Sequence, residues 1–523
     1  MPPNAMRQPG RILLATLLLT ACARPDIAAV RAPRSGVVET GTASRISHVG
    51  RWLVDAKGRV KIVHGVNVVV KHPPYAPAPM GFGTKEMDGL AREGFNGVRL
   101  GVVHAALEPQ PGVSDDGYLA SLQATQQQLA ARGVFTLIDM HQDGYSRQYA
   151  DPRRLRQMAE GNTGAAEVNN GFAGWMSPDH GLPNENPGHP YYYMTSQAIN
   201  RAFDDLYANA QGPAGSGLAD QFAGTWRRVA QAFAGKPGVL GYELLNEPWP
   251  GTGWPTCASV QGCPGFDRDV MTPFHQRLLR SIRQVDTDTL VFQEPNPLFN
   301  VGVSTHVDKL DGRSGFAFHN YAYKSDRLFQ ALGARSGHSA LAAAVAPLIR
   351  GTPAEREARV FANAEAHARA TGDALLMTEF GGIDAPDGNL QTVGRMVAAA
   401  DDAMMPWFYW RYPVPADSSR ASWEDLLDVL VRPYPQAVAG TPQFWRFDRS
   451  NRVFTLCYAT QPVGAALQPG ALTQVFVPER HYPHGYRVEV SGAIVRSAPH
   501  ARHLHLAAED GASEVTVRIL PLP

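Results

Sequence analysis

Short apolar runs alternate with amphipathic stretches from about residue 50 to about residue 430. The runs have the length and composition of buried strands. The stretches between them, such as 118–133 and 222–235, repeat apolar residues at helical spacing. A strand and a helix repeated eight times predict an α/β fold of the parallel (β/α)8 type, a TIM barrel. The eight runs are IVHGVNV (62–68), FNGVRLG (95–101), VFTLIDM (134–140), VLGYELLN (239–246), TLVFQE (289–294), GFAFHN (315–320), ALLMTEF (374–380) and MPWFYW (405–410).

The pattern changes after about residue 431. Short strand-like runs now follow one another with turn residues between them, which is typical of a β-sandwich. We therefore expect a catalytic barrel over residues 46–430 and a C-terminal β-sandwich over residues 431–523. The strand-like runs are FWRFDRS (444–450), VFTLCYAT (453–460), TQVFVPER (473–480), YRVEVSG (486–492), HLHLAAE (503–509) and SEVTVRIL (513–520).

The N-terminal segment predicts export. Two arginine residues precede the apolar run 12–21, which suits a secretory signal but is too short for a stable membrane span. The run ends in LTAC (19–22), which resembles the lipobox of bacterial lipoproteins. We favour a lipoprotein-type signal peptide over residues 1–22 with lipidation at Cys22, and the alternative is an ordinary signal peptide. Residues 23–45 are rich in small and polar residues and predict a flexible linker.

Charge and cysteine content narrow the classes of partner. The chain has 48 basic and 48 acidic side chains, so no overall field favours nucleic acid. In an exported protein, the close pair Cys257 and Cys263 favours a disulfide, and its spacing fits no common zinc site. Cys457 lies in an apolar strand pattern and is expected to be a buried free thiol. We expect a monomer.

Polar residues at the C-terminal ends of barrel strands face one shared site. The fourth run ends in Asn246 and is followed by Glu247, and the seventh run carries Glu379 near its end. Other polar and aromatic side chains end or follow the remaining runs. These are Lys71, His72, Arg99, Asp139, His141, Asp143, Glu294, His319, Tyr321 and Trp410.

Two carboxyl groups at one site are what glycoside hydrolysis requires. One, kept protonated, donates to the leaving oxygen, and the other, ionised, attacks the anomeric carbon. Their surroundings must push the two pKa values apart, and a neighbouring arginine and a tyrosine hydroxyl would keep the nucleophile ionised. Asn246 would hydrogen-bond the sugar 2-OH, and Trp410 would stack on a sugar ring. A retaining mechanism requires carboxyl groups about 5 Å apart.

Other chemistries have less support in the sequence. G-x-S-x-G, Walker A, H-E-x-x-H and G-x-G-x-x-G motifs are absent. His141 and Asp143 are the best candidates for metal ligands, but further ligands are not evident. We therefore expect neither a metal nor a cofactor.

The motifs LNEP (245–248) and TEFG (378–381) resemble the acid/base and nucleophile motifs of glycoside hydrolase family 5. Other residues match the active-site set of that family in order and at the expected strands. The resemblance implies a retaining β-glycosidase in which Glu247 is the acid/base and Glu379 the nucleophile. The matching residues are Arg99, His141, Asn246, Glu247, His319, Tyr321, Glu379 and Trp410.

Longer segments resemble the bacterial endoglycoceramidases within that family, over most of residues 46–490. The segments are DMHQD (139–143), AGWMSPDHGLP (173–183), RAFDDLY (201–207) and RPYPQAVAGTPQFWRFD (432–448). These enzymes cut the β-linkage between the glycan and the ceramide of glycosphingolipids. The resemblance implies a glycolipid substrate at a membrane or micelle surface and a set of residues near the sugars next to the cut. Those residues are Lys71, His141, Asp143, Trp175 and Trp410.

Several loops differ from the pattern of these relatives. Gly144 stands where a bulky apolar residue follows the motif, and the segments 190–194, 251–265 and 325–365 also differ. The long loop 144–200 is expected on the C-terminal face of the barrel, where sites are built. Substrate preference is therefore less determined than the chemistry.

Two other functions remain open. One is a β-glucosidase that acts on simple glucolipids such as glucosylceramide or a steryl glucoside. The other is a non-catalytic glycolipid-binding lipoprotein, which the presence of both Glu247 and Glu379 argues against. Apolar side chains in the segments 174–183 and 297–303 would take lipid chains, or they are ordinary loop residues.

Overall fold

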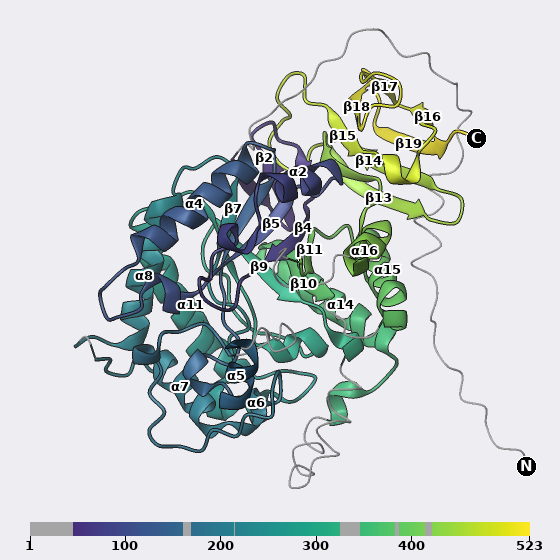
Figure 1. The fold of residues 1–523 in the computed structure, drawn as a ribbon. Helices are drawn as coiled ribbons and strands as arrows, with labels where there is room; N and C mark the ends of the chain where they lie inside the picture. The colour runs from purple at the N-terminus through teal and green to yellow at the C-terminus, as the bar shows by residue number, and fades with distance from the viewer. Residues whose placement is uncertain (1–44, 160–168, 214, 325–345, 382–385, 414–420) are drawn as a thin grey trace, which may run out of the picture.

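The computed structural model describes residues 45–159, 169–213, 215–324, 346–381, 386–413 and 421–523 (Figure 1). The predicted signal peptide, its Cys22 and all but the last residue of the predicted linker 23–45 lie outside these residues. In the described part of the chain, no helix has both the length and the apolar character needed to cross a bilayer.

Eight parallel strands close into a barrel, as the eight apolar runs predict. Sequential strands are neighbours, and the barrel closes where Trp407 of the last strand pairs with His64 of the first. Every residue of these strands is buried, which explains their nearly continuous apolar sequence. The strands are β4 (His64–Val68), β5 (Gly97–Val102), β6 (Phe135–Met140), β7 (Val239–Glu243), β8 (Leu290–Gln293), β9 (Ser314–His319), β10 (Ala374–Gly381) and β11 (Trp407–Trp410).

Large aromatic side chains fill the lower barrel, and glycines on the neighbouring strands make room for them. A Cβ atom at Gly65 would lie 2.4 Å from the ring of Phe408, and one at Gly315 would lie 2.3 Å from Phe292. Both phenylalanines belong to a buried apolar cluster drawn from several barrel strands. The barrel is therefore a packed core below its C-terminal end.

Helices cover the outside of the barrel (Figure 1). Local sequence explains their ends: Thr352 and Glu355 form a capping box, Pro353 opens the helix, and Gly372 ends it with φ 73°. The longer helices are α2 (Thr84–Arg92), α4 (Asp116–Ala130), α5 (Pro152–Ala159), α7 (Gln197–Tyr207), α8 (Leu218–Phe233), α11 (Thr272–Arg283), α14 (Pro353–Thr371), α15 (Pro386–Asp402) and α16 (Ala421–Leu430). Shorter ones are α3 (His104–Leu107), α6 (Tyr192–Thr195), α9 (Trp254–Cys257) and α10 (Pro264–Phe266).

The long segment after β6 returns to the barrel mouth. The backbone groups of Asp143 and Asn170 exchange hydrogen bonds of 3.0 and 2.9 Å. Aromatic side chains join the segment to α7 and α8, with Tyr145 packed on Phe172 and Phe203. This segment therefore lies on the C-terminal face, where the loop 144–200 was expected.

Two antiparallel sheets accompany the barrel, and one of them draws on both ends of the chain. Its strand order is β1-β2-β3-β12-β15-β18-β17, and the second sheet is β13-β14-β19-β16. Residues 46–61, which the sequence pattern placed in the barrel range 46–430, form β1 to β3 of this sheet, and β3 pairs with β12. The strands are β1 (Ile46–Val49), β2 (Trp52–Asp55), β3 (Val60–Lys61), β12 (Tyr434–Val438), β13 (Thr441–Asp448), β14 (Val453–Ala459), β15 (Thr473–Phe476), β16 (Tyr486–Ser491), β17 (Ala493–Val495), β18 (His503–Ala508) and β19 (Glu514–Pro521).

The sheets contact chain segments that precede barrel strands. The Tyr434 hydroxyl donates to the carbonyl of Gly94 at 2.7 Å, shortly before β5. Ahead of β11, Asp401 accepts from Arg432 at 2.9 Å and from the Trp445 indole at 3.1 Å. These contacts lie at the N-terminal end of the barrel, so they leave the opposite end to the site.

We expect Arg432→Ala to lower the free energy of unfolding by about 3–5 kcal/mol, because it leaves the Asp401 carboxylate buried without its cation. The side chains of Arg432 and Asp401 are each 3% exposed. Arg446 and Asp402 are the control, since Asp402 follows Asp401 on α15 and both members of this pair are exposed, at 58% and 49%. Arg446→Ala should cost less than about 1 kcal/mol. Chemical denaturation followed by circular dichroism measures both, and equal losses would contradict the prediction.

Candidate active site

The inward-facing positions of the barrel strands change from apolar to polar toward their C-terminal ends. On β6, Phe135 and Leu137 belong to the apolar cluster, and Asp139 follows on the same face. On β8, Phe292 is followed two residues later by Glu294. A polar layer therefore lies above the apolar core. Its members on or just after the strands are Asn67, Arg99, Asp139, Glu243, Asn246, Glu294, His319 and Glu379.

Arg99 lies at the centre of this layer and is fully buried. Four carboxyl groups and two amides surround its guanidinium group. Burial alone would lower its pKa, but the surrounding carboxylates outweigh burial and raise the pKa of Arg99 well above its usual range. Nε contacts Glu243 at 2.5 Å, Nη1 contacts Asn67 at 3.0 Å and Glu379 at 2.6 Å, and Nη2 contacts Asn246 at 2.9 Å, Asp139 at 3.0 Å and Glu294 at 3.2 Å.

Glu379 receives one donor on each carboxylate oxygen. Arg99 donates to Oε1 at 2.6 Å, and the Tyr321 hydroxyl donates to Oε2 at 2.9 Å. Burial and then Glu379 raise the pKa of Tyr321 well above its usual value, so the hydroxyl keeps its proton. The two donors stabilise the ionised form of Glu379 and fix its orientation.

Glu247 lies opposite and has a different set of partners. The Asn300 amide donates to its Oε1 at 2.8 Å, and His319 Nδ1 lies 3.0 Å from the same oxygen. The residue has φ 45°, a left-handed conformation that is rare outside glycine. The side chain that approaches Glu247 most closely is therefore an uncharged amide, and Glu379 has a guanidinium instead.

The two carboxyl groups are close enough for a double-displacement reaction. One oxygen of Glu247 and one of Glu379 lie within 4.8 Å of each other and of a His319 ring nitrogen. Retaining enzymes hold their carboxyl groups about 5 Å apart, whereas inverting enzymes need about 6.5–9.5 Å. Burial raises the pKa of both carboxyl groups, and the Arg99 cation opposes that effect at Glu379. Direct contact with Arg99 assigns the ionised form to Glu379 and leaves the proton to Glu247.

His319 lies between the two carboxyl groups and is neutral. Burial lowers the pKa of its ring to about 4, although Glu379 acts in the opposite direction. Nδ1 lies 3.0 Å from Glu247 and 3.6 Å from Glu379. A neutral ring contacts both carboxyl groups without adding a charge to either of them.

A second polar cluster lies beside the carboxyl pair. Lys71 Nζ contacts Asp143 at 2.7 Å and lies 4.4 Å above the Trp410 ring, which stacks on His141 at 5.3 Å. His141 lies between Asp139 (2.7 Å) and Asp143 (3.2 Å). Burial would lower the pKa of His141, but the two aspartates raise it to about 9. The cluster therefore carries a protonated imidazole, and Asp139 connects it to Arg99.

Ten of the eleven catalytic and sugar-binding residues predicted from the sequence belong to these two contact networks. Trp175 does not: its indole donates to the Glu108 carbonyl at 2.9 Å and its ring lies 5.6 Å from His104. Its sugar contact stays a prediction. Sequence patterns gave no signal for Asn300, and Glu294 was visible only as a glutamate at a strand end. Further partners that the predicted set lacks are Asn67, Asp139, Gln142, His189 and Glu243.

Among the residues that the structure describes, three groups of histidine and acidic side chains bring one ligand atom from each member within 4.8 Å of the others, which is close enough to hold a metal ion. Asp143 already contacts Lys71, and Glu379 already contacts Arg99, so protein cations balance these carboxylates. We derive no metal-dependent step from them. The groups are Asp143, His189 and Glu247; Glu243, Glu294 and His319; and Glu247, His319 and Glu379.

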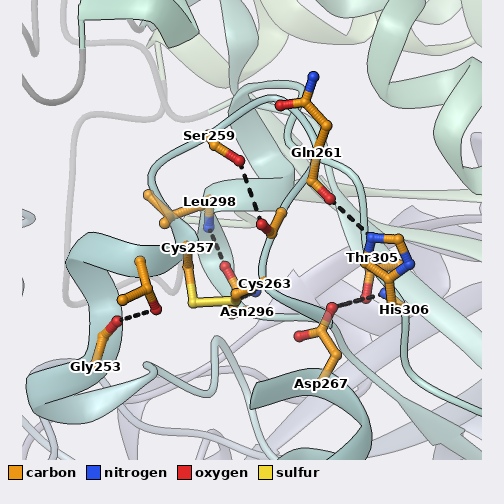
Figure 2. The surroundings of a disulfide bond; sticks show 12 residues. Gly253, Cys257, Ser259, Gln261, Cys263, Asp267, Asn296, Leu298, Thr305 and His306 are labelled. Atoms are coloured by element: carbon orange, nitrogen blue, oxygen red, sulfur yellow. Dashed lines mark hydrogen bonds between the residues drawn. A yellow bond between two sulfur atoms is a disulfide. The ribbon is translucent and has the colours of Figure 1, made fainter. Parts of the chain in front are cut away.

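A disulfide joins Cys257 to Cys263 in the loop after β7, as their spacing suggested (Figure 2). Cys457 is a buried free thiol, as expected. The disulfide loop contacts the segment after β8, where the Gln261 carbonyl lies 2.8 Å from His306 Nε2. The same segment carries Asn300, so the loops that hold Glu247 and its amide partner contact each other.

The chain matches the cellulase family (glycosyl hydrolase family 5) over residues 63–413 and the glycoside hydrolase family 5 C-terminal domain over residues 432–519. It is 33% identical to Endoglycoceramidase I of Rhodococcus hoagii (strain 103S), over 90% of this chain and 87% of that protein. Endo-glycoceramidase II from Rhodococcus sp., solved with ganglioside GM3, superposes with a TM-score of 0.70 at 28% identity, covering 90% of this chain and 99% of that chain. A glucosylceramidase of Cryptococcus neoformans var. grubii is 28% identical over only 40% of this chain and 34% of that protein.

We expect Lys71→Met to move the alkaline limb of the pH profile of kcat/KM to higher pH. The Lys71 cation lowers the pKa of Glu247, and its removal also takes one of the cations away from Asp143, whose negative charge raises that pKa. A group that must be protonated then works up to a higher pH. Lys236→Met is the control, because Lys236 is exposed in a turn after α8. An alkaline limb that stays in place or moves to lower pH in Lys71→Met would count against Glu247 as the acid.

Proposed function

This chain belongs to glycoside hydrolase family 5, and from that premise we propose that it hydrolyses the bond between the glycan and the ceramide of glycosphingolipids with retention of configuration. The observation that carries the proposal is the pair of buried carboxyl groups with oxygens within 4.8 Å. The pair supports the reaction, and 33% identity to Endoglycoceramidase I over 90% of the chain supports the class of substrate.

The first step forms a covalent glycosyl-enzyme. The ionised Glu379 attacks the anomeric carbon while Glu247 gives its proton to the glycosidic oxygen, so that the ceramide leaves as an alcohol. Arg99 and Tyr321 donate to the two oxygens of Glu379 and hold it in line for attack. As the ester forms, one Glu379 oxygen loses its charge, and Arg99 keeps its remaining carboxylate partners.

The second step returns both carboxyl groups to their starting states. Glu247, now ionised, takes a proton from water, and the resulting hydroxide attacks the anomeric carbon and displaces Glu379. The Asn300 amide donates to Glu247 at 2.8 Å and stabilises this ionised form. Two displacements at the same carbon give a product with the configuration of the substrate.

We assign binding of the sugar next to the glycosidic bond to the residues around Glu247 and Glu379. Asn246 accepts from Arg99 at 2.9 Å and donates to the Gln142 carbonyl at 2.9 Å, so its amide is fixed and one N–H is left for the sugar 2-OH. Asp143 and the edge of Trp410 complete the sugar site in this proposal. The fixed Lys71–Asp143 pair presents charged groups to sugar hydroxyls.

We also propose that the enzyme is exported and attached to a membrane. The predicted signal peptide 1–22 and lipidation at Cys22 would hold the enzyme near a membrane or micelle that presents its substrate. Apolar side chains of the segments 174–183 and 297–303 would take the lipid chains. In the second of these, Leu298, Phe299 and Val301 are largely buried, so they contribute through the walls of the site rather than through an exposed patch.

A β-glucosidase acting on simple glucolipids is the second candidate, because a glucosylceramidase matches part of the chain. The two candidates differ in their products. An endo-acting enzyme releases an intact oligosaccharide and ceramide, whereas a β-glucosidase releases free glucose only from monoglucosylated lipids.

We expect the wild-type enzyme to release intact oligosaccharides from glycosphingolipids with two or more sugars. Mass spectrometry of the products from a panel of glycolipids measures this. Glu379→Gln removes the nucleophile with little change of shape and should reduce turnover to background, so it controls for contaminating activity. Glucose as the main product, with larger glycans uncut, would favour the β-glucosidase, and binding without turnover would favour a non-catalytic protein.

The separate roles of the two glutamates are tested with azide. We expect Glu247→Ala to lose about 10²–10⁴-fold in kcat/KM on a lipid substrate, because acid catalysis is gone. With an activated aryl β-glycoside, azide should restore its turnover and give a β-glycosyl azide, since attack on the covalent intermediate comes from the β face. Glu379→Ala should give the α-azide instead, detected by NMR. Exchange of the two outcomes would reverse the assignment.

We expect Cys22→Ser to move the enzyme from the membrane fraction of its bacterial host to the soluble exported fraction, because the lipid would be lost. Immunoblots of both fractions measure the change. Cys457→Ser changes a buried thiol in β14 and should leave the distribution as in the wild type. If the wild type is already soluble, the ordinary signal peptide is correct and the anchor is not.

A further inference from the structure

The backbone of Glu247 has an unusual conformation that needs support. Its φ of 45° lies in the left-handed region, where the Cβ of a non-glycine residue crowds the backbone. Such residues persist only when their surroundings hold them in place, and they concentrate at functional sites. The conformation turns the chain at the end of β7, immediately before Pro248.

Side chains that follow β6 and β8, the strands on either side of β7, hold this backbone. The Glu247 N–H donates to Glu294 Oε2 at 3.2 Å. The Gln142 amide donates to the Glu247 carbonyl at 3.0 Å and to the Asn246 carbonyl at 2.8 Å. Both peptide groups of Glu247 are thus bound by side chains rather than by a strand or helix.

Glu294 also reaches the groups that hold the nucleophile. Its Oε1 accepts from Arg99 at 3.2 Å, and Arg99 contacts Glu379 at 2.6 Å. Its Oε2 lies 3.4 Å from Nε2 of His319, and Nδ1 of the same ring lies 3.0 Å from Glu247. One side chain therefore connects the acid/base backbone, the guanidinium beside the nucleophile and the ring between the two carboxyl groups.

We propose that Glu294 is a positioning residue that holds the backbone of Glu247 in the conformation required for acid catalysis. The inference rests on the proposed function of Glu247. Glu294 lies behind the peptide group of Glu247 and acts through it, so it is distinct from the two reacting carboxyl groups.

The charges around Glu294 favour its neutral form. Four buried carboxyl groups contact the Arg99 cation, Asp139 also contacts the protonated His141, and His319 is neutral. Burial first, and then Glu243, raise the pKa of Glu294 well above its usual value, and the attraction of Arg99 does not reverse this. Asp139 acts in the same direction as Glu243. A neutral Glu294 spares the buried layer a further uncompensated charge.

Two substitutions of similar size separate position from charge. Glu294→Gln stays neutral and keeps an oxygen that can accept from Glu247, so kcat/KM on a glycosphingolipid should fall by about threefold or less. Glu294→Asp keeps a carboxyl group but withdraws it by one methylene, so the N–H of Glu247 loses its acceptor. A displacement of that size costs about 10²-fold in rate when it misaligns a catalytic group.

The leaving group shows which step is affected. Lipid aglycones need the proton of Glu247 to leave, whereas a 2,4-dinitrophenyl β-lactoside does not. Glu294→Asp should therefore lose about 10²-fold in kcat/KM on the lipid and about threefold or less on the dinitrophenyl lactoside. Glu509→Asp, an exposed residue at the end of β18, is the control for the same change elsewhere.

Each outcome supports or overturns the inference. Equal losses of Glu294→Asp on both substrates would mean that Glu294 supports the site as a whole, and a loss of Glu294→Gln as large as that of Glu294→Asp would exclude a neutral acceptor. Full activity of Glu294→Asp on the lipid would also overturn it.

Thermal unfolding of each variant identifies misfolding. If Glu294→Asp misfolds, the activities of Glu294→Gln on the two substrates decide instead. A wild-type enzyme that cleaves the lactoside but no glycosphingolipid contradicts the proposed function and leaves this inference open to test with an alkyl lactoside, whose aglycone also needs the proton.

Discussion

The burial of Arg99 is the constraint on which the active site depends. A guanidinium group without solvent must satisfy its donors inside the barrel, and here it does so with partners on or next to β4, β6, β7, β8 and β10. Removing a charge from water is costly unless its partners are placed well, so the contacts require these strand ends to keep one register. Because side chains alternate along a strand, the polar groups of these strands all lie in one layer, above the apolar layer that fills the barrel. The chemistry of the site depends on the contacts within this polar layer.

The same arginine makes two similar glutamates unequal. Glu379 contacts the guanidinium directly and also accepts from Tyr321, whereas Glu247 has an amide and a neutral imidazole as its closest partners. Burial raises the pKa of both, so burial alone would not separate an acid from a nucleophile. The separation comes from the position of one cation. His319 contributes by staying neutral between them, because a charged ring at that position would favour ionisation of both carboxyl groups.

The sequence predicted the parts of the fold that depend on local patterns. All eight barrel strands were visible because fully buried parallel strands have continuous apolar runs, and Glu247 and Glu379 stood out as carboxyl groups at strand ends. Pairing of β3 with β12 was not visible, since residues near 60 and 438 meet only after the barrel between them has formed. Asn300 was missed for a related reason. It lies on a short 3-10 turn, η7 (Pro297–Val301), whose path is set by packing, so no periodicity indicates that its amide faces Glu247.

Strand ends and loops therefore contribute in different ways to the function. The strand ends fix the reaction, because Arg99 and Glu379 belong to the polar layer at the barrel mouth and Glu247 directly follows Asn246 of that layer. The loops supply what the strands do not: Asn300 and the contact of Gln142 with the Glu247 backbone. The disulfide loop contacts the segment that carries Asn300, so even a loop outside the site affects how firmly the acid/base is held. A change of substrate would then require loops to change without disturbing Glu294, which holds the acid/base backbone from the strand side.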